Sequence, residues 1–294
     1  MKLVDVRFHA PRGLEEALAL LEGLKDARVM AGGTDLLVDI KQGLREVRDI
    51  VSLHRIAELK GIEDEGDRLR IGALVTVREL ASNAAVAKHI PALADAARSM
   101  ASEQIRSIAT IGGNISSAVP SADLPPPLIA ADAGVELESS RSARRMSLLE
   151  FFTGPRETVC LATELLRSVV IPLPPPNTGI SYFRFTLREA SALAVASVAC
   201  RITLKSGVVD RATVVLGAVA PTPILANKAS RSLLGKNPSA ELFREAASHA
   251  KEEAKPISDI RGCVWHRKEL VHVLTQRALA EALERALGKA EVAE

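Results

Sequence analysis

Two short segments combine paired glycines with small polar side chains. Residues 30–37 read Met-Ala-Gly-Gly-Thr-Asp-Leu-Leu, and residues 110–116 read Thr-Ile-Gly-Gly-Asn-Ile-Ser. Each follows an apolar run typical of a strand. Because glycine has no Cβ, backbone N–H groups in such segments can closely approach a ligand, and a row of exposed amides binds phosphate. The pattern predicts two anion-binding loops.

Neighbouring side chains extend this chemistry. Thr34, Asn114 and Ser116 could hydrogen-bond phosphate or ribitol, whereas the Asp35 carboxylate would repel it and is expected to cap a helix over residues 36–42. Two such loops about 80 residues apart suit a long ligand with a central diphosphate, such as a dinucleotide. The sequence has neither G-x-G-x-x-G nor the P-loop pattern, and each Gly-Gly pair alone is also typical of an ordinary turn.

Metal-ligating patterns are absent from the sequence. Cys160, Cys200 and Cys263 are far apart and form no C-x-x-C pair, and the six histidines show no ligand spacing. We therefore expect no metal site, and we interpret the cysteines as small buried side chains in a reducing cytoplasm.

Composition indicates a globular chain of two domains. The 294 residues are 47% hydrophobic and 25% charged, and a proline-rich run at residues 172–176 places a boundary between domains 1–176 and 177–294. Hydrophobic spacing alternates between strand and helix in both parts, which predicts an α+β fold. A strand pair over residues 193–204 and 208–219, joined by a Gly-containing turn, is expected in the second domain, followed by helices over 226–234, 239–250 and 264–287.

Charge and hydropathy exclude other classes. A net charge of +2 gives no basic stripe for nucleic acid, and no apolar run reaches the length of a membrane span. These features favour a cytoplasmic protein with no integral membrane contact.

The chain resembles the FAD-binding medium subunit of the molybdenum hydroxylases, the family of xanthine dehydrogenase and carbon monoxide dehydrogenase. The resemblance extends over nearly the whole chain, and it lies in residues 31–36, 71–73 with Thr76, 104–106, 110–114, Asp123 and 259–262.

This resemblance implies a two-subdomain FAD-binding domain of the vanillyl-alcohol-oxidase (PCMH) type, followed by a smaller α+β domain. It also implies a set of FAD-contacting residues and no catalytic residue. The set is Val29, Met30, Ala31, Gly32, Gly33, Thr34, Asp35, Leu36, Ser102, Thr110, Ile111, Gly112, Gly113, Asn114, Asp123, Leu165, Leu166 and Arg184.

Two of these residues also have ordinary structural interpretations. Asp123 precedes a Leu-Pro-Pro run and could cap a helix, and Arg184 could be a surface charge at a strand edge. The resemblance instead places both at the cofactor, where a cation beside the flavin N1–C2=O edge stabilises the reduced anion. Ala192 stands where relatives often carry an acidic or aromatic side chain near the ring.

The resemblance implies an electron-transfer subunit that passes electrons from iron–sulfur clusters on a partner chain through FAD to an external acceptor. Molybdopterin and the clusters are expected only on a large and a small partner subunit, within a dimer of heterotrimers. A stand-alone FAD-dependent oxidoreductase of the same domain type and a non-catalytic maturation or scaffold homologue are the alternatives.

Overall fold

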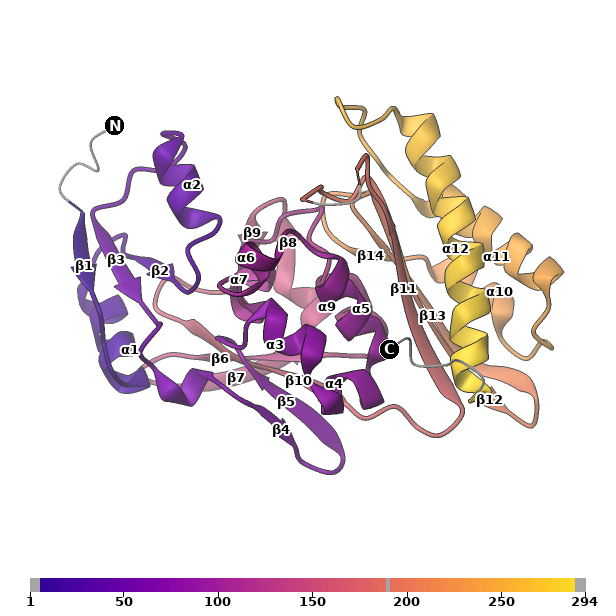
Figure 1. Cartoon of the computed structure of the whole chain (residues 1–294), viewed down its shortest axis with the longest axis horizontal. Helices are drawn as coiled ribbons and strands as arrows, with labels where there is room; N and C mark the ends of the chain where they lie inside the picture. The colour runs from indigo at the N-terminus through magenta and orange to yellow at the C-terminus, as the bar shows by residue number, and fades with distance from the viewer. Residues whose placement is uncertain (1–5, 189–190, 289–294) are drawn as a thin grey trace.

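A computed structural model describes residues 6–188 and 191–288. The chain begins with a small parallel sheet, at one end of the molecule in Figure 1, in the order β1 (Arg7–His9), β3 (Asp49–Ser52), β2 (Arg28–Met30). Helix α1 (Leu14–Gly23) buries Leu14, Ala17, Leu18 and Leu21 at helical spacing, so its apolar face packs into this unit. Helix α2 (Leu36–Lys41) follows β2 directly.

A five-stranded antiparallel sheet forms the centre of the molecule. Its strand order is β4 (Ile62–Asp64), β5 (Arg68–Gly72), β10 (Leu165–Pro172), β6 (Gly134–Glu138), β7 (Ala143–Ser147). A short 3₁₀ turn (Ala57–Leu59) and a two-stranded hairpin, β8 (Phe152–Gly154) with β9 (Glu157–Thr158), flank this sheet. The last strand of the first part therefore pairs with strands from well before it in the sequence.

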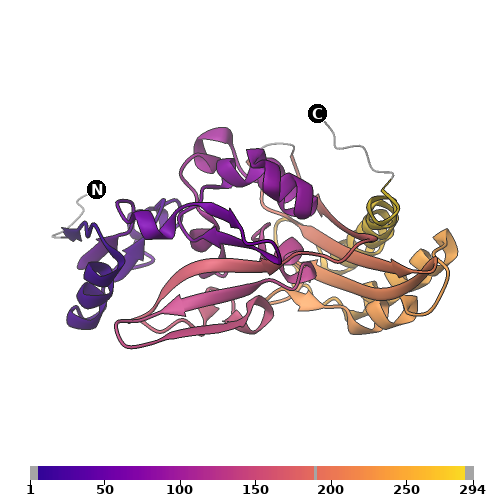
Figure 2. The ribbon, with the colours of Figure 1, turned by 90° about the horizontal axis from the view of Figure 1, so that it is seen from below.

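Short helices pack over this central sheet (Figures 1 and 2). They are α3 (Val77–Ser82), α4 (Ala84–His89), α5 (Pro91–Ser99), α6 (Glu103–Arg106), α7 (Ile111–Ser116), α8 (Pro125–Ala130) and α9 (Leu148–Phe151). Residues 77–87 form two helices instead of one, because Asn83 separates α3 from α4. The Asn83 side chain accepts a hydrogen bond from the Val86 N–H and caps a new helix, α4.

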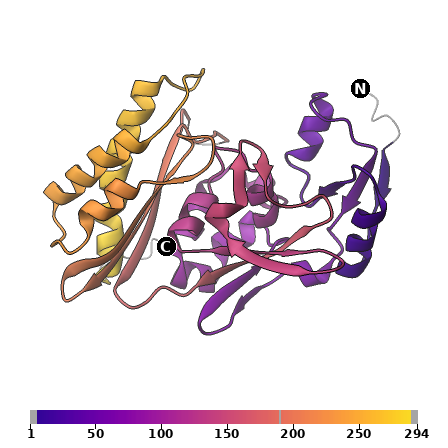
Figure 3. The same ribbon diagram turned by 180° about the vertical axis from the view of Figure 1, so that it is seen from behind.

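The second part is a four-stranded antiparallel sheet in the order β11 (Thr178–Phe185), β12 (Ala196–Lys205), β13 (Val208–Gly217), β14 (Ile224–Leu225). Helices α10 (Asn227–Leu233), α11 (Ala240–Glu253) and α12 (Val264–Ala286) cover one face (Figure 3). The other face contributes Ile180, Tyr182, Ala199 and Val215 to the core of the first part. The predicted hairpin and the three predicted helices are present.

Strands β11 and β14 of this sheet have no counterpart among the predicted ranges, although the sequence analysis gave Arg184 a possible place at a strand edge. Strand β11 pairs along its whole length with β12 and carries Tyr182 and Arg184 toward the first part of the chain. No helix within residues 6–188 and 191–288 combines the length and apolar character needed to cross a membrane.

Candidate functional site

A cavity of about 610 Å³ lies between the first small sheet, the central helices and the start of β10. Its volume is in the range of small-molecule sites. Every residue that the sequence predicted to bind a cofactor lines this cavity except Ile111 and Arg184. The two glycine-rich segments, 80 positions apart, therefore do meet at one site.

The first segment forms the turn between β2 and α2. A Cβ at Gly32 would overlap the carbonyl oxygen of Ile108 and lie 2.7 Å from its carbon, so only glycine permits this approach. Gly33 has a φ of 72°, the left-handed conformation that glycine adopts readily. None of the hydrogen bonds among the described residues uses the backbone N–H of residues 32–36. These free amides, called the amide nest below, are available to an anion, as the predicted anion-binding loop requires.

Asp35 does not cap this helix as predicted. It occupies the N-cap position of α2, but its φ and ψ of −98° and −50° are helical and its side chain makes no capping hydrogen bond. A cap requires an extended backbone that turns the carboxylate back toward the first-turn amides, and this geometry is missing. The amides at the start of α2 are thus left to a ligand.

The second segment differs from its prediction, because residues 111–116 form helix α7. The Thr110 hydroxyl caps it by accepting a 3.0 Å hydrogen bond from the Gly113 N–H. The Ile111 and Gly112 amides donate to the carbonyls of Val75 and Ala73, at 2.9 Å each. This segment is therefore not a second nest of free amides.

Close packing explains the glycine at position 112. A Cβ there would lie 2.7 Å from both the Cβ and the carbonyl oxygen of Ala73, so α7 can rest against that segment only with glycine. The Ile111 side chain is fully buried in the core and points away from the cavity wall. Asn114 does face the cavity, and its buried Oδ1 has no hydrogen-bond partner. An unsatisfied buried acceptor of this kind suits a ligand donor.

The remaining predicted wall residues come from two further elements. Ser102 caps α6, where its hydroxyl accepts from the Ile105 N–H at 3.4 Å. Leu165 and Leu166 are the buried first residues of β10.

Asp123 and Arg184 form one buried network. Arg184 Nη1 donates to Asp123 Oδ2 at 2.8 Å, and the Tyr182 hydroxyl donates to Asp123 Oδ1 at 2.7 Å. Arg184 also donates to the carbonyl oxygens of Ser99 and Ala192. Burial raises the pKa of Asp123, partly offset by the positive charge of Arg184 and by these hydrogen bonds. Burial and the neighbouring carboxylate raise the pKa of Tyr182 well above its ordinary value.

The structure excludes both ordinary interpretations, a helix cap for Asp123 and a surface charge for Arg184. Helix α8 begins after Leu124 and has no side-chain cap, so Asp123 is not a capping residue. The Arg184 side chain is 8% exposed and is not a surface charge. Asp123 reaches the cavity wall, whereas Arg184 lies behind it and holds the carboxylate in place.

Sequence reasoning missed several wall residues, namely Asp39, Arg45, Arg156, Thr158, Cys160 and Glu164. Arg156 lies in the turn between β8 and β9, which has no glycine-rich or polar signature pointing to a ligand. The prediction that the cysteines are buried is confirmed for Cys200. It is wrong for Cys263, which is exposed, and Cys160 is only half-buried, in the cavity wall.

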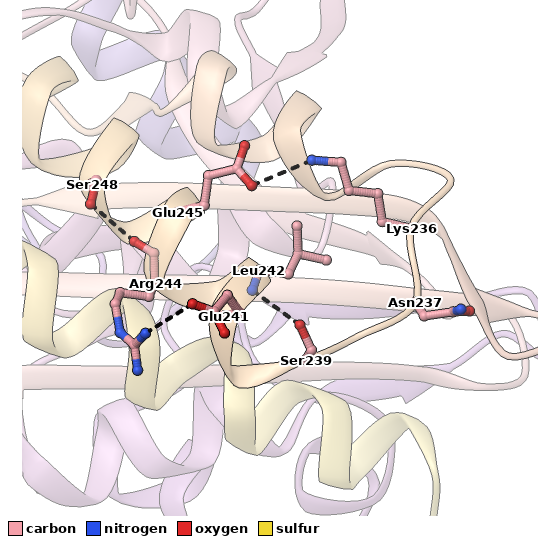
Figure 4. Close-up of a pocket in the computed structure, with 8 residues that line it drawn as sticks. All are labelled: Lys236, Asn237, Ser239, Glu241, Leu242, Arg244, Glu245 and Ser248. Atoms are coloured by element: carbon pink, nitrogen blue, oxygen red, sulfur yellow. Dashed lines mark hydrogen bonds and ion pairs between the residues drawn. The ribbon is translucent and has the colours of Figure 1, made fainter.

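A second hollow of about 470 Å³ lies at the start of α11 (Figure 4). Its charged side chains pair with one another: Lys236 lies 3.4 Å from Glu245, and Arg244 lies 3.4 Å from Glu241. The Ser239 hydroxyl caps α11. These groups already satisfy one another, so the hollow offers no binding chemistry comparable to the first cavity.

Residues 4–174 match a protein family described as the FAD binding domain in molybdopterin dehydrogenase, which is more than half of the chain. The chain belongs to this family. Residues 181–282 of this flavoprotein match the CO dehydrogenase flavoprotein C-terminal domain. These matches confirm the predicted family, fold class and cofactor.

Relatives of the flavoprotein cover nearly all of it. The glyceraldehyde dehydrogenase medium chain of Sulfolobus acidocaldarius is 32% identical, over 91% of this chain and 95% of its own. The xanthine dehydrogenase FAD-binding subunit of Escherichia coli O157:H7 is 31% identical, over 96% and 97%. The structure of carbon monoxide dehydrogenase from Hydrogenophaga pseudoflava superposes with a TM-score of 0.93 at 32% identity, over 97% of this chain and 99% of that one.

The cavity fits the family's cofactor on its own geometry. The free amides of residues 32–36 suit a diphosphate, and the orphaned Oδ1 of Asn114 suits a ribityl hydroxyl. FAD accepts one or two electrons when bound, which lets a flavoprotein connect one-electron carriers to two-electron acceptors. This chain's residues would bind and orient it. Among the described residues, no group of three or more His, Cys, Asp or Glu side chains is arranged to hold a metal ion.

Proposed function

We propose that this chain is the medium subunit of a three-subunit molybdenum hydroxylase. In this assembly a large subunit carries molybdopterin, a small subunit carries iron–sulfur clusters, and two heterotrimers form the complete enzyme. This proposal rests on relatives that are named medium chains or FAD-binding subunits and that match along almost their whole length. Electrons reach FAD on this chain from the clusters and leave to an external acceptor in the cytoplasm.

The cavity supports a specific placement of FAD. The diphosphate lies over the free amides of residues 32–36, while Ser102, Asn114, Leu165 and Leu166 contact the rest of the cofactor. Asp123 touches the flavin end, and Arg184 acts through Asp123 as a positioning residue. Within this proposal the boundary at residue 176 separates the FAD-binding domain from the C-terminal domain, whose strand β11 supplies that arginine.

Reconstitution with FAD tests the cofactor assignment. The full chain, or the complex that contains it, is expected to bind FAD near 1:1 and to show oxidised-flavin absorption near ~450 nm. A folded sample that takes up no flavin after incubation with excess FAD contradicts the assignment.

Purification from native cells tests the assembly. An affinity-tagged chain should co-purify with one molybdopterin-containing and one iron–sulfur-containing protein, at a mass by light scattering that fits two heterotrimers. A flavin-loaded chain that purifies alone and oxidises a small substrate by itself favours a stand-alone oxidoreductase.

A further inference from the structure

Two arginines in the cavity wall share a single carboxylate. Arg156 Nη1 lies 2.8 Å and Arg45 Nε lies 3.1 Å from the same oxygen, Asp39 Oδ2. All three residues line the cavity. The two guanidinium side chains are 46% and 35% exposed, so both can donate further hydrogen bonds into the cavity. Two cations against one anion leave one positive charge at this wall.

The packing of α2 indicates that Asp39 is buried because its carboxylate pairs with arginines. Asp39 is the one buried residue of α2, whereas Leu37 and Val38 of the same helix are exposed. A helix ordinarily buries its apolar side chains, so α2 is anchored to the opposite wall by an ion pair instead. Arg156 supplies that anchor from the turn between β8 and β9.

This charge lies beside the amide nest. Asp39 follows Asp35 by four residues, about one helical turn or ~6 Å along the axis of α2. Arg156 is fixed near it in a left-handed backbone conformation, with a φ of 63°, while its N–H donates to the Ala118 carbonyl at 2.8 Å. The guanidinium groups are thus within reach of an anion seated on the amides of residues 32–36.

The other buried carboxylates of the wall already have cation partners. Asp123 pairs with Arg184, and Glu164 pairs with Arg144 at 2.8 Å. Arg28 and Asp35, which also line the cavity, are opposite in formal charge. The surplus cation at Asp39 therefore matches a ligand that brings negative charge, and the diphosphate of a dinucleotide does so.

We propose that Arg156 and Arg45 form a cation clamp for the FAD diphosphate, with Asp39 as the residue that positions both. This inference rests on the proposed function, because it assumes that FAD occupies the cavity. The clamp adds side-chain charge to the neutral backbone nest, and it joins α2 to the β8–β9 turn around the same phosphates.

Competition binding on the flavin-free protein tests the clamp. FAD affinity is measured by quenching of flavin fluorescence, with ADP and riboflavin as competitors that carry the diphosphate or the ring alone. Arg156→Ala and Arg45→Ala are each expected to weaken FAD and ADP about tenfold, as for one partly exposed charged hydrogen bond, and to leave riboflavin unchanged. In Arg156→Lys, which keeps the charge, the affinity for FAD should fall about threefold or less.

Salt dependence and a matched variant provide the controls. The FAD affinity of the wild type should fall with added salt more steeply than that of Arg156→Ala, because the variant has one charged contact fewer. Arg211→Ala removes an equally charged but exposed residue of β13 outside the cavity, and it should bind FAD like the wild type.

The outcomes separate the two proposals. If Arg156→Ala weakens the binding of riboflavin and FAD equally, the clamp is overturned and Arg156 only helps to shape the cavity wall. Unchanged FAD affinity in this variant also overturns the clamp. A wild-type protein that binds neither FAD nor riboflavin overturns the proposed function, and the clamp with it.

Discussion

Arg184 Nη1 donates a 2.8 Å hydrogen bond to Asp123 Oδ2 across 61 positions of the chain, and this bond joins the C-terminal sheet to the wall of the larger cavity. Both side chains are below one-tenth exposed. Tyr182, two residues before Arg184 on β11, holds the other carboxylate oxygen. The two parts of the chain therefore complete the site together. The first provides most of the cavity wall, and the second provides residues 191–193 of that wall and the charge that keeps Asp123 in place.

Replacing Arg184 should destabilise the protein strongly. Arg184→Met leaves the buried Asp123 carboxylate without its cation, at an expected cost of about 3–5 kcal/mol in the free energy of unfolding. Urea denaturation measures this cost. The double variant Arg184→Met/Asp123→Asn should recover part of the loss, since it removes the unpaired charge. Arg211→Met on the exposed face of β13 is the control, and an Arg184→Met loss below about 1 kcal/mol contradicts the buried-pair interpretation.

A single methyl group at Gly32 should damage both stability and cofactor binding. In Gly32→Ala the new Cβ meets the Ile108 backbone, which cannot rotate away like a side chain, so about 1–3 kcal/mol of stability should be lost. FAD affinity should fall because the amides of residues 32–36 move. Gly23→Ala at the end of α1 has nothing within 4 Å of its Cβ and should be neutral or stabilising by up to ~1 kcal/mol. Calorimetry and flavin titration compare the two variants, and equal behaviour refutes the close-approach argument.

Local patterns in the sequence were sufficient where local forces decide the structure. The spacing of Leu14, Leu18 and Leu21 predicts α1, and the Ser206-Gly207 turn predicts the β12–β13 hairpin, in which both residues have positive φ. The glycine pairs were enough to indicate where the cavity lies, because glycine is needed wherever two backbones or a backbone and a ligand meet closely.

Tertiary contacts decided what the sequence could not show. Glycines disfavour helices, yet residues 111–116 form α7 because Thr110 caps it and Gly112 fits against Ala73. Strand β11 follows a proline-rich run and has no regular alternation, so only its pairing with β12 defines it. Arg45 and Arg156 both contact Asp39, and Arg156 lies 117 positions from it in the sequence. No local pattern predicts this contact.

Acid should weaken the N-terminal sheet through Asp49. Asp49 accepts hydrogen bonds from Arg7 at 2.7 and 2.8 Å and approaches His9 Nε2 at 2.8 Å, and these partners lower its pKa from 3.8 to about 2. A lowered folded-state pKa means that the stabilisation is complete above pH 3.8 and is lost as the pH falls toward 2. The free energy of unfolding should therefore drop over this window. In Asp49→Asn, protein stability should already be lower at pH 7, and this part of the drop should be absent.

Urea titrations at several pH values between 7 and 2 measure this effect. Asp210→Asn, at an exposed position of β13, removes a carboxylate that makes none of these contacts and should preserve the wild-type pH profile. An Asp49→Asn profile that parallels the wild type down to pH 2 contradicts the assignment.

Cysteine labelling should report whether FAD fills the cavity. Burial, reinforced by Glu164, raises the pKa of the Cys160 thiol to about 11, so about one molecule in a thousand carries the reactive thiolate at pH 8. Iodoacetamide should therefore modify the exposed Cys263 first and Cys160 slowly, with a Cys160 rate that rises about tenfold per pH unit up to pH 10. Cys200, fully buried with a raised pKa, should react only after unfolding.

Since Cys160 lines the cavity, saturating FAD should suppress its labelling and leave that of Cys263 unchanged, as peptide mass spectrometry can quantify. Equal Cys160 labelling with and without bound FAD shows that the cofactor lies elsewhere.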